Sequence, residues 1–158
     1  MSDLRRAAEQ ALEKYGESLM RVAYTYTKNM QDAQDMVQDA FLRYMSSAPQ
    51  FSSDEHEKAW LIRVTINICK NHLSSAYRRN YAELDENMSV CDTYSSGLAE
   101  IVNSLPEKYR IVIHLFYYED YTQKQIAKAL GITESAVSTR LQRGRKLLKE
   151  KIGDDYFD

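Results

Sequence analysis

The sequence predicts an all-α protein that consists of two small helical domains joined by a flexible acidic linker. Apolar residues recur at three- and four-residue steps through most of the 158 residues, and only five Gly and two Pro interrupt them. One segment, residues 80–97, lacks this periodicity and contains four acidic residues but no Lys or Arg. We therefore expect a first domain at 1–79, a linker at 80–97, a second domain at 98–153 and a tail at 154–158.

Two amphipathic helices are expected at the start of the chain. The first ends near Lys28, and Asn29 is suited to cap the second. The apolar positions follow helical spacing, as Leu4, Ala8, Leu12, Tyr15, Leu19, Val22, Ala23 and Tyr26, then as Ala33, Met36, Val37, Ala40, Phe41 and Tyr44. The opposite face of the second helix carries Asp32, Asp35, Gln38, Asp39 and Arg43. This face is either a solvated surface or the seat of a basic helical partner.

A third helix is expected at about 55–79. It follows a loop that contains the breaker Pro49, and either Ser53 or Asp54 is suited to cap it. Phe51 in this loop is either a plug in the core or an exposed group for stacking. One face of the helix combines cations and amides near Trp60, namely Arg63, Asn67, Lys70, Asn71, Ser74 and Arg78. This face is either solvated or suited to single-stranded DNA, whose bases stack on rings and whose phosphates need neutralising.

The second domain is expected to begin with a short helix around Ile101. Ser104 and Glu107 have the spacing of a capping box for the next helix, with Pro106 in its first turn. The stretch 111–118 is strongly apolar. It lies directly before the stretch that resembles a helix-turn-helix.

A helix-turn-helix is expected after this apolar stretch. Thr122 and Gln125 have the spacing of a capping box that opens a short helix. Gly131 falls where that helix must stop, because glycine adopts left-handed backbone without a steric penalty. Either Thr133 or Ser135 caps the helix that follows.

The last helix has the pattern of a DNA-recognition helix. Residues 136–151 contain six Lys or Arg and one acidic residue, although the chain as a whole is not basic. Four apolar residues point inward, namely Val137, Leu141, Leu147 and Leu148, and the outer face holds Ser135, Ser138, Thr139, Gln142 and Arg143. Small polar groups followed by cations suit base edges and phosphates in a major groove. The alternative is an amphipathic helix with a solvated basic face.

Composition excludes several other classes of protein. The net charge of −2 and the pI near 6.0 give no overall attraction to nucleic acid, so DNA contacts must come from local patches or with the help of a partner. Cys69 and His72 lie one helical turn apart, but no second pair accompanies them, and we expect no metal. The sequence shows no Gly-rich phosphate loop, HExxH motif or nucleophile elbow, its first ten residues lack the apolar core expected of a signal peptide, and no stretch approaches 18 apolar residues. We expect a cytoplasmic protein that is not an enzyme and does not insert into a membrane.

Three motifs together resemble the extracytoplasmic-function (ECF) class of RNA polymerase sigma factors, a branch of the sigma-70 family. The first is DAQDMVQDAFLR at 32–43, which is similar to the family's core-binding motif. The second is AWLIRVTINICKNHL at 59–73, a Trp-Leu pair followed by a basic helix with a central Asn. The third comprises LPEKYR at 105–110, IAKALG at 126–131 and VSTRLQRGRKLL at 137–148. They come in family order over almost the whole chain.

The resemblance implies partners and roles for three groups of residues. Core RNA polymerase, through its β′ clamp helices, would be bound by Asp35, Gln38, Asp39, Leu42 and Arg43. Melted −10 DNA would be captured by Phe51, Trp60, Arg63, Asn67, Lys70 and Asn71. Duplex −35 DNA would be bound by Ser135, Ser138, Thr139, Arg140, Arg143 and Lys146. The resemblance also implies contact with the β flap, a linker directed toward the RNA exit path, and control by an anti-sigma factor.

The sequence departs from the family pattern at two places. The third helix carries Asn71-His72-Leu73-Ser74 where the family has an Asp-His-Leu-Arg-like sequence. Gly144 replaces a better helix former, which costs about 1 kcal/mol and predicts a less rigid distal recognition helix. Two other functions remain as alternatives: a sigma mimic that sequesters an anti-sigma factor, and a helix-turn-helix regulator that acts without polymerase and needs a dimer for affinity.

Overall fold

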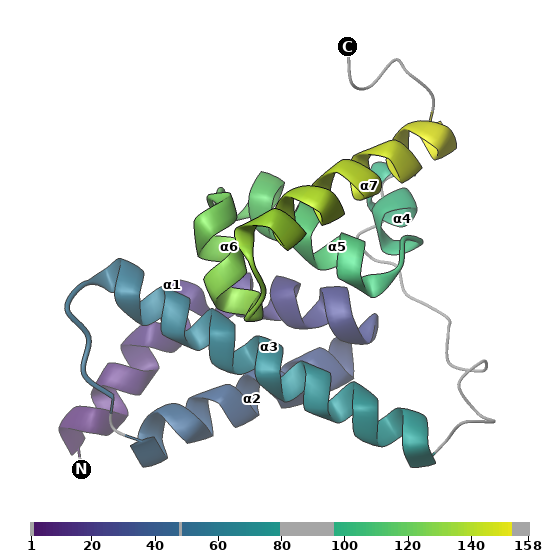
Figure 1. Ribbon diagram of the computed structural model, residues 1–158. Coiled ribbons are helices and arrows are strands. Elements are labelled where there is room, and N and C mark those ends of the chain that lie inside the picture. The colour runs from purple at the N-terminus through teal and green to yellow at the C-terminus, as the bar shows by residue number, and fades with distance from the viewer. Residues whose placement is uncertain (1, 48, 80–96, 153–158) are drawn as a thin grey trace. The chain divides into compact units, whose positions relative to one another are not determined.

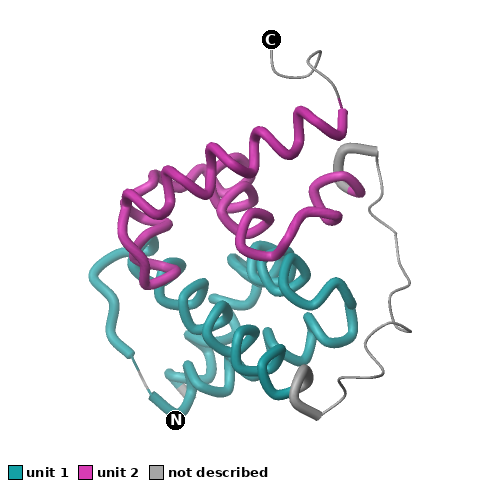
Figure 2. Tube along the Cα trace, turned by 45° about the vertical axis from the view of Figure 1, so that its right-hand side comes forward, with its two compact units in different colours: residues 1–88 teal, residues 89–158 magenta. Residues whose placement is uncertain are grey.

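The computed structural model describes residues 2–47, 49–79 and 97–152, which form seven α-helices and one π-helical segment and contain no strand (Figure 1). The all-α fold expected from the sequence is confirmed. The chain divides into two compact units, residues 1–88 and residues 89–158 (Figure 2). Except for Gly97, which begins a helix, the expected linker lies outside the described residues, as does the expected tail.

Unit 1 is a bundle of three helices that all pack against one another: α1 (Ser2–Thr27), α2 (Met30–Ser47) and α3 (Asp54–Arg79). Their facing sides enclose a core whose largest fully buried side chains are Leu19, Val22, Leu61, Ile62 and Ile66. Burial of a side chain of this size stabilises a fold by about 1.5–3 kcal/mol. The polar faces of α2 and α3 are therefore presented by a fixed scaffold.

Side-chain caps set the starts of α2 and α3. The Asn29 side-chain oxygen accepts a hydrogen bond from the Asp32 N–H at 2.9 Å, and the Ser53 hydroxyl accepts one from the His56 N–H at 3.1 Å. Lys28 adopts a φ of 54°, which lets the chain reverse between α1 and α2. The cap expected at Asn29 is confirmed, and Ser53 is the residue that caps the third helix.

Leu12 does not belong to the core of unit 1, contrary to the apolar spacing of the first helix. Its side chain is 49% exposed, whereas Ala8 and Ala11 on the same helix are buried. The small alanine side chains let α1 lie close to its neighbours, so the bulkier Leu12 is left at the edge of the contact.

Unit 2 packs α4 (Gly97–Asn103), α5 (Glu107–Ile113) and α6 (Gln123–Leu130) against α7 (Glu134–Ile152). The capping box expected from Ser104 and Glu107 is wrong. Pro106 is the N-cap of α5, which has no side-chain cap bond, and the Ser104 hydroxyl donates instead to the Ile101 carbonyl at 2.6 Å. Since this bond closes the end of α4, the hydroxyl is turned away from the start of α5.

A π-helical turn, η2 (His114–Tyr118), follows α5 without a break. The Glu119 N–H bonds to the His114 carbonyl five residues earlier at 3.2 Å. Asp120, at a φ of 59°, then turns the chain toward α6. π-Helical turns are rare and occur frequently at functional sites, which makes η2 a candidate functional segment.

The helix-turn-helix formed by α6 and α7 matches the sequence prediction in its local details. The Gln125 N–H donates to the Thr122 hydroxyl at 3.1 Å, and the Thr122 N–H donates to the Gln125 side chain at 2.8 Å, which completes the capping box. Gly131 ends α6 in left-handed backbone at a φ of 70°. Thr133 caps α7, because its hydroxyl accepts from the Ala136 N–H at 3.0 Å.

Gly144 allows α7 to approach α5 closely. It is buried, and a Cβ added to it would lie 2.7 Å from the Ile113 Cδ1 atom and 3.5 Å from the Tyr109 Cβ atom. Glycine at this position was predicted to make the helix less rigid. Its missing methyl group also lets α7 pack tightly against α5, and this packing opposes the loss of rigidity. Leu147, which was expected to point inward, is only half-buried, whereas Val137, Leu141 and Leu148 are buried.

Candidate nucleic-acid interface

The outer face of α2 combines polar side chains with an exposed leucine. Leu42 is 64% exposed, and Met45 beside it on the next turn is 39% exposed. Around Leu42 lie the other residues that the family resemblance assigns to polymerase docking, all of them exposed except the half-buried Asp39: Asp35, Gln38, Asp39 and Arg43. We call these five residues the α2 face, in which polar and charged side chains surround one exposed apolar side chain.

An aromatic cluster lies where the loop after α2 meets the start of α3. The ring of Phe51 lies 5.9 Å from Tyr44, 5.8 Å from Trp60 and 5.2 Å from His56, measured between centroids. Phe51 and Trp60 are both partly exposed. Phe51 was expected to be either a core plug or an exposed stacking group. It has features of both, because its ring packs against the cluster and is still partly exposed to solvent.

Tyr44 anchors this cluster from α2. It is 3% exposed, and its hydroxyl donates a 2.7 Å hydrogen bond to the Glu57 carboxylate. Burial, together with this bond, raises the pKa of the Tyr44 phenol well above its ordinary value. The phenol therefore stays protonated and joins α2 to α3 at neutral pH.

A polar stripe runs along α3 from the aromatic cluster. Arg63, Asn67, Lys70 and Asn71 are all exposed and follow one another at four-, three- and one-residue steps, so they share one helix face. Trp60 lies one turn before Arg63. The structure thus brings the six residues expected at −10 DNA onto one helix and the loop before it.

Cys69 and His72 do not form part of a metal site in the described residues. Cys69 is buried, and the His72 Nε2 atom lies 3.9 Å from the Asp32 carboxylate of α2. Among the described residues, no group of three or more His, Cys, Asp or Glu side chains could hold a metal ion. His72 instead lies at the contact between α2 and α3.

The outer face of α7 carries the residues expected to bind duplex DNA. Ser135, Arg143 and Lys146 are exposed, whereas Ser138, Thr139 and Arg140 are half-buried. Ser135, Ser138, Thr139, Gln142 and Lys146 follow one another at three-, one-, three- and four-residue steps and therefore form one stripe. We call these five residues the α7 stripe, with hydroxyl and amide groups in its first half and a cation after them.

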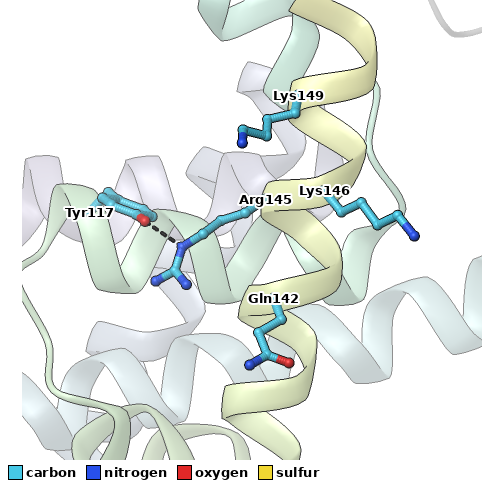
Figure 3. Close-up of a pocket in the computed structure, with 5 residues that line it drawn as sticks. All are labelled: Tyr117, Gln142, Arg145, Lys146 and Lys149. Carbon is cyan, nitrogen blue, oxygen red and sulfur yellow. Dashed lines mark hydrogen bonds between the residues drawn. The ribbon is translucent and has the colours of Figure 1, made fainter. Parts of the chain in front are cut away.

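The structure adds a pocket that sequence reasoning missed. It is open, has a volume of about 510 Å³ and is lined by Tyr117, Gln142, Arg145, Lys146 and Lys149 (Figure 3). The Arg145 Nε–H donates to the Tyr117 hydroxyl at 2.6 Å. The sequence shows that Arg145 and Lys149 are one helical turn apart. It does not show that Tyr117, 28 residues before Arg145, is the hydrogen-bond partner of Arg145, because η2 places Tyr117 there.

Comparison with protein families matches both units. Residues 11–79 match the model for sigma-70 region 2, and residues 96–148 match the model for sigma-70 region 4. The first match includes the α2 face, the aromatic cluster and the polar stripe. The second includes the α7 stripe.

Curated relatives are similar along most of their length. The sigma factor SigV of Bacillus subtilis is 29% identical over 135 residues, which cover 82% of this chain and 81% of SigV. The ECF sigma factor SigW of the same organism is 24% identical, over 89% of this chain and 86% of SigW. The ECF sigma factor SigM of Mycobacterium tuberculosis is 27% identical, over 94% of this chain and 79% of SigM.

Solved structures share the fold. The sigma factor RpoE from Bartonella quintana, solved in complex with the anti-sigma factor NepR, has a TM-score of 0.70 at 20% identity, covering 92% of this chain and 98% of that one. CnrH, solved in complex with the cytosolic domain of CnrY, has a TM-score of 0.67 at 25% identity, covering 98% and 91%. With two matched regions in family order and relatives of similar length, the chain belongs to the ECF class of sigma-70 family RNA polymerase sigma factors.

Proposed function

We propose that this sigma factor binds core RNA polymerase through the α2 face and directs promoter-specific initiation through DNA contacts on α3 and α7. The observation that supports this most is that the family's region 2 and region 4 are both present and that none of the expected contact residues in either region is buried. Its curated relatives are sigma factors, which are transcription factors rather than catalytic enzymes. The proposed work of this chain is therefore binding, and we assign it no covalent step.

Docking on polymerase is proposed for the α2 face because its centre is apolar and its rim is polar. Burial of an exposed leucine between charged neighbours gives both affinity and a fixed orientation. The expected partner is the pair of β′ clamp helices. For unit 2, the expected polymerase contact is the β flap.

Capture of melted −10 DNA is proposed for the aromatic cluster and the polar stripe of α3. Unpaired bases stack on exposed aromatic rings, and cations beside the rings neutralise phosphates. Phe51 and Trp60 provide the rings, while Arg63 and Lys70 provide the charge, with Asn67 and Asn71 as hydrogen-bonding groups. Stacking of this kind is worth about 1–3 kcal/mol per base.

Recognition of duplex −35 DNA is proposed for the α7 stripe and the neighbouring arginines Arg140 and Arg143. Hydroxyl and amide groups early in the helix are suited to base edges, and the cations are suited to the phosphates on either side. The protein is expected to act in the cytoplasm, under an anti-sigma factor of the kind bound by RpoE from Bartonella quintana. None of the described helices combines the length and apolarity needed to cross a membrane.

Run-off transcription with core RNA polymerase on a genomic promoter library tests this function. Start sites that appear only with the protein, and that share paired elements at a fixed spacing, are the expected result. If the protein neither binds core polymerase nor adds start sites in the absence of any inhibitor, the sigma mimic becomes the better explanation. If the protein binds promoters without polymerase, the stand-alone regulator does.

A further inference from the structure

The guanidinium of Arg145 is held in one orientation by an aromatic corner. Its Nε–H donates to the Tyr117 hydroxyl at 2.6 Å, and its central carbon lies 5.6 Å from the ring centroids of both Phe116 and Tyr117. Figure 3 shows the two terminal nitrogens on the side away from Tyr117, in the direction of Gln142. A guanidinium fixed in this way presents a planar fork, the geometry that binds two oxygens of one phosphate.

The pocket around this fork is strongly cationic. Arg145, Lys146 and Lys149 line it, together with Gln142 and Tyr117, so its lining carries three positive charges and no acidic group. The chain as a whole has a net charge of −2. Three like charges in one pocket repel each other, and a bound anion relieves that repulsion. The pocket therefore favours an anionic ligand.

The position of the pocket on α7 indicates which anion it binds. Gln142 and Lys146 belong to both the pocket and the α7 stripe, so the pocket opens on the helix face proposed to read duplex DNA. Arg143 and Arg145 flank Gln142 on opposite sides of the helix, at about 100° and 60°. Because a helix about 10–12 Å wide nearly fills a major groove about 12 Å wide, its flanks face the phosphates of the groove walls.

We propose that the Tyr117–Arg145 pair, with Lys149, forms a phosphate-binding site for the duplex backbone beside the proposed −35 contacts. Arg145 is the phosphate ligand, and Tyr117 is a positioning residue that acts through it. The π-helical turn η2 serves this site, since it carries Phe116 and Tyr117, the two consecutive rings that contact one guanidinium. This proposal rests on the proposed function of α7 and adds a second line of phosphate contacts opposite Arg143.

Scanning single phosphates tests the proposal. Holoenzyme assembled from the full chain and core polymerase is bound to a promoter duplex from the run-off experiment, with one phosphate at a time replaced by a neutral methylphosphonate. In the wild type, neutralising one phosphate beside the −35 element is expected to weaken binding about tenfold. In Arg145→Gln, which keeps most of the side chain, the same replacement has no further effect, and the slope of log affinity against log salt becomes shallower by about 0.9.

Two further variants separate orientation from charge. Tyr117→Phe keeps the ring, which is 52% exposed, and removes the hydroxyl. It is expected to weaken binding about threefold and to reduce the effect of the same methylphosphonate. Lys151→Gln removes one charge from an exposed position on α7 outside the pocket, and the methylphosphonate effect should remain as in the wild type. Thermal melting of each variant verifies that the fold is retained.

The arginine on the other flank distinguishes the possible failures. Arg143→Ala is expected to weaken duplex binding and to flatten its salt dependence. Suppose that Arg143→Ala weakens binding while Arg145→Gln responds to each methylphosphonate as the wild type does. The proposed phosphate site is then wrong, and the assignment of α7 as the recognition helix is retained. If neither variant changes affinity or salt slope, the placement of the recognition helix is wrong. If Arg145→Gln impairs only binding to a protein partner, the pocket binds an acidic protein surface, and the phosphate site is overturned.

Discussion

Single residues connect the packing of this sigma factor to its chemistry. Tyr44 is buried in unit 1 and holds Glu57 through its hydroxyl, while its ring contacts both Phe51 and Trp60. In unit 2, Gly144 is buried against Ile113. Tyr44 thus links a hydrogen bond to the ring cluster, and Gly144 permits close packing of α7 on α5, so substitutions at such positions test these contacts.

Gly144→Ala is expected to destabilise unit 2 by about 1 kcal/mol. Overpacking a core costs about 1–3 kcal/mol and replacing a helical glycine gains about 1 kcal/mol, so the net cost is centred near 1 kcal/mol. The nearest atom to the new methyl is the Ile113 Cδ1 atom at 2.7 Å. In an Ile113→Val background, which lacks that atom, Gly144→Ala should instead stabilise. Urea denaturation of the four proteins in this double-mutant cycle measures the reversal, and equal effects in both backgrounds would contradict it.

Tyr121 is expected to make unit 2 sensitive to alkaline pH. Burial, and to a smaller extent the Glu119 carboxylate, raises the pKa of its phenol from 10.0 to about 12. Since the fold favours the protonated phenol, the stability that it contributes is complete below pH 10 and is lost as the pH rises from about 10 to 12. The urea midpoint of the wild type should therefore fall more steeply above pH 10 than that of Tyr121→Phe. Tyr118→Phe, which keeps Tyr121, should fall like the wild type.

At the scale of elements, most of the expected helix ends followed from local chemistry, with the Ser104–Glu107 capping box as the exception, whereas contacts across the chain did not. The caps at Asn29 and Thr122 and the turn at Gly131 depend on residues within three or four positions, so the sequence predicts them. The π-helical turn and the Tyr117–Arg145 bond depend on how α5 and α7 pack, which no local pattern encodes. Leu12 was misplaced for the same reason, because the spacing of apolar residues does not show which edge of a helix its neighbours reach.

The α2 face supplies a prediction at this scale. Leu42→Asp should weaken binding to core polymerase by about 2 kcal/mol or more, roughly 30-fold, because an exposed apolar centre of an interface becomes charged. Its effect on stability should stay within about 0.5 kcal/mol, since Leu42 is 64% exposed. Leu12→Asp is the matched control, at another exposed leucine of unit 1, and should leave binding unchanged. Binding is measured by fluorescence anisotropy with core polymerase. Equal losses of affinity in both variants would contradict the assignment of the α2 face to polymerase docking.

At the scale of the whole molecule, the sequence predicted the all-α fold and the family, because three motifs in order are far more specific than any one of them. The contact residues assigned to polymerase and to DNA remain predictions. The proposed contacts give a reason for the presence of both units, since each unit would offer only a few cations or apolar groups, on a protein with a net charge of −2. Patches this small bind weakly alone, and joining them on polymerase makes the second DNA contact intramolecular.

Separating the two units should therefore weaken promoter binding. A protease site inserted between Met88 and Ser89, at the division between the units, allows cleavage after purification. Cleaved protein mixed with core polymerase should form promoter complexes about 100-fold less tightly than uncleaved protein with the same insertion. Filter binding to a promoter fragment measures the ratio. If cleavage leaves affinity unchanged, the two DNA contacts do not depend on the covalent connection.

The two sides of α2 have a consequence for the exchange of parts between related sigma factors. One side carries Leu42 and Arg43, which we propose as polymerase contacts, and the other carries Tyr44 into the ring cluster around Phe51. A hybrid that receives only α2 from a relative would therefore bring foreign packing to the rings. Transfer of all of unit 1 keeps α2 and the rings together, so polymerase affinity and −10 preference are inherited as one trait, whereas −35 preference follows unit 2 and can be exchanged separately.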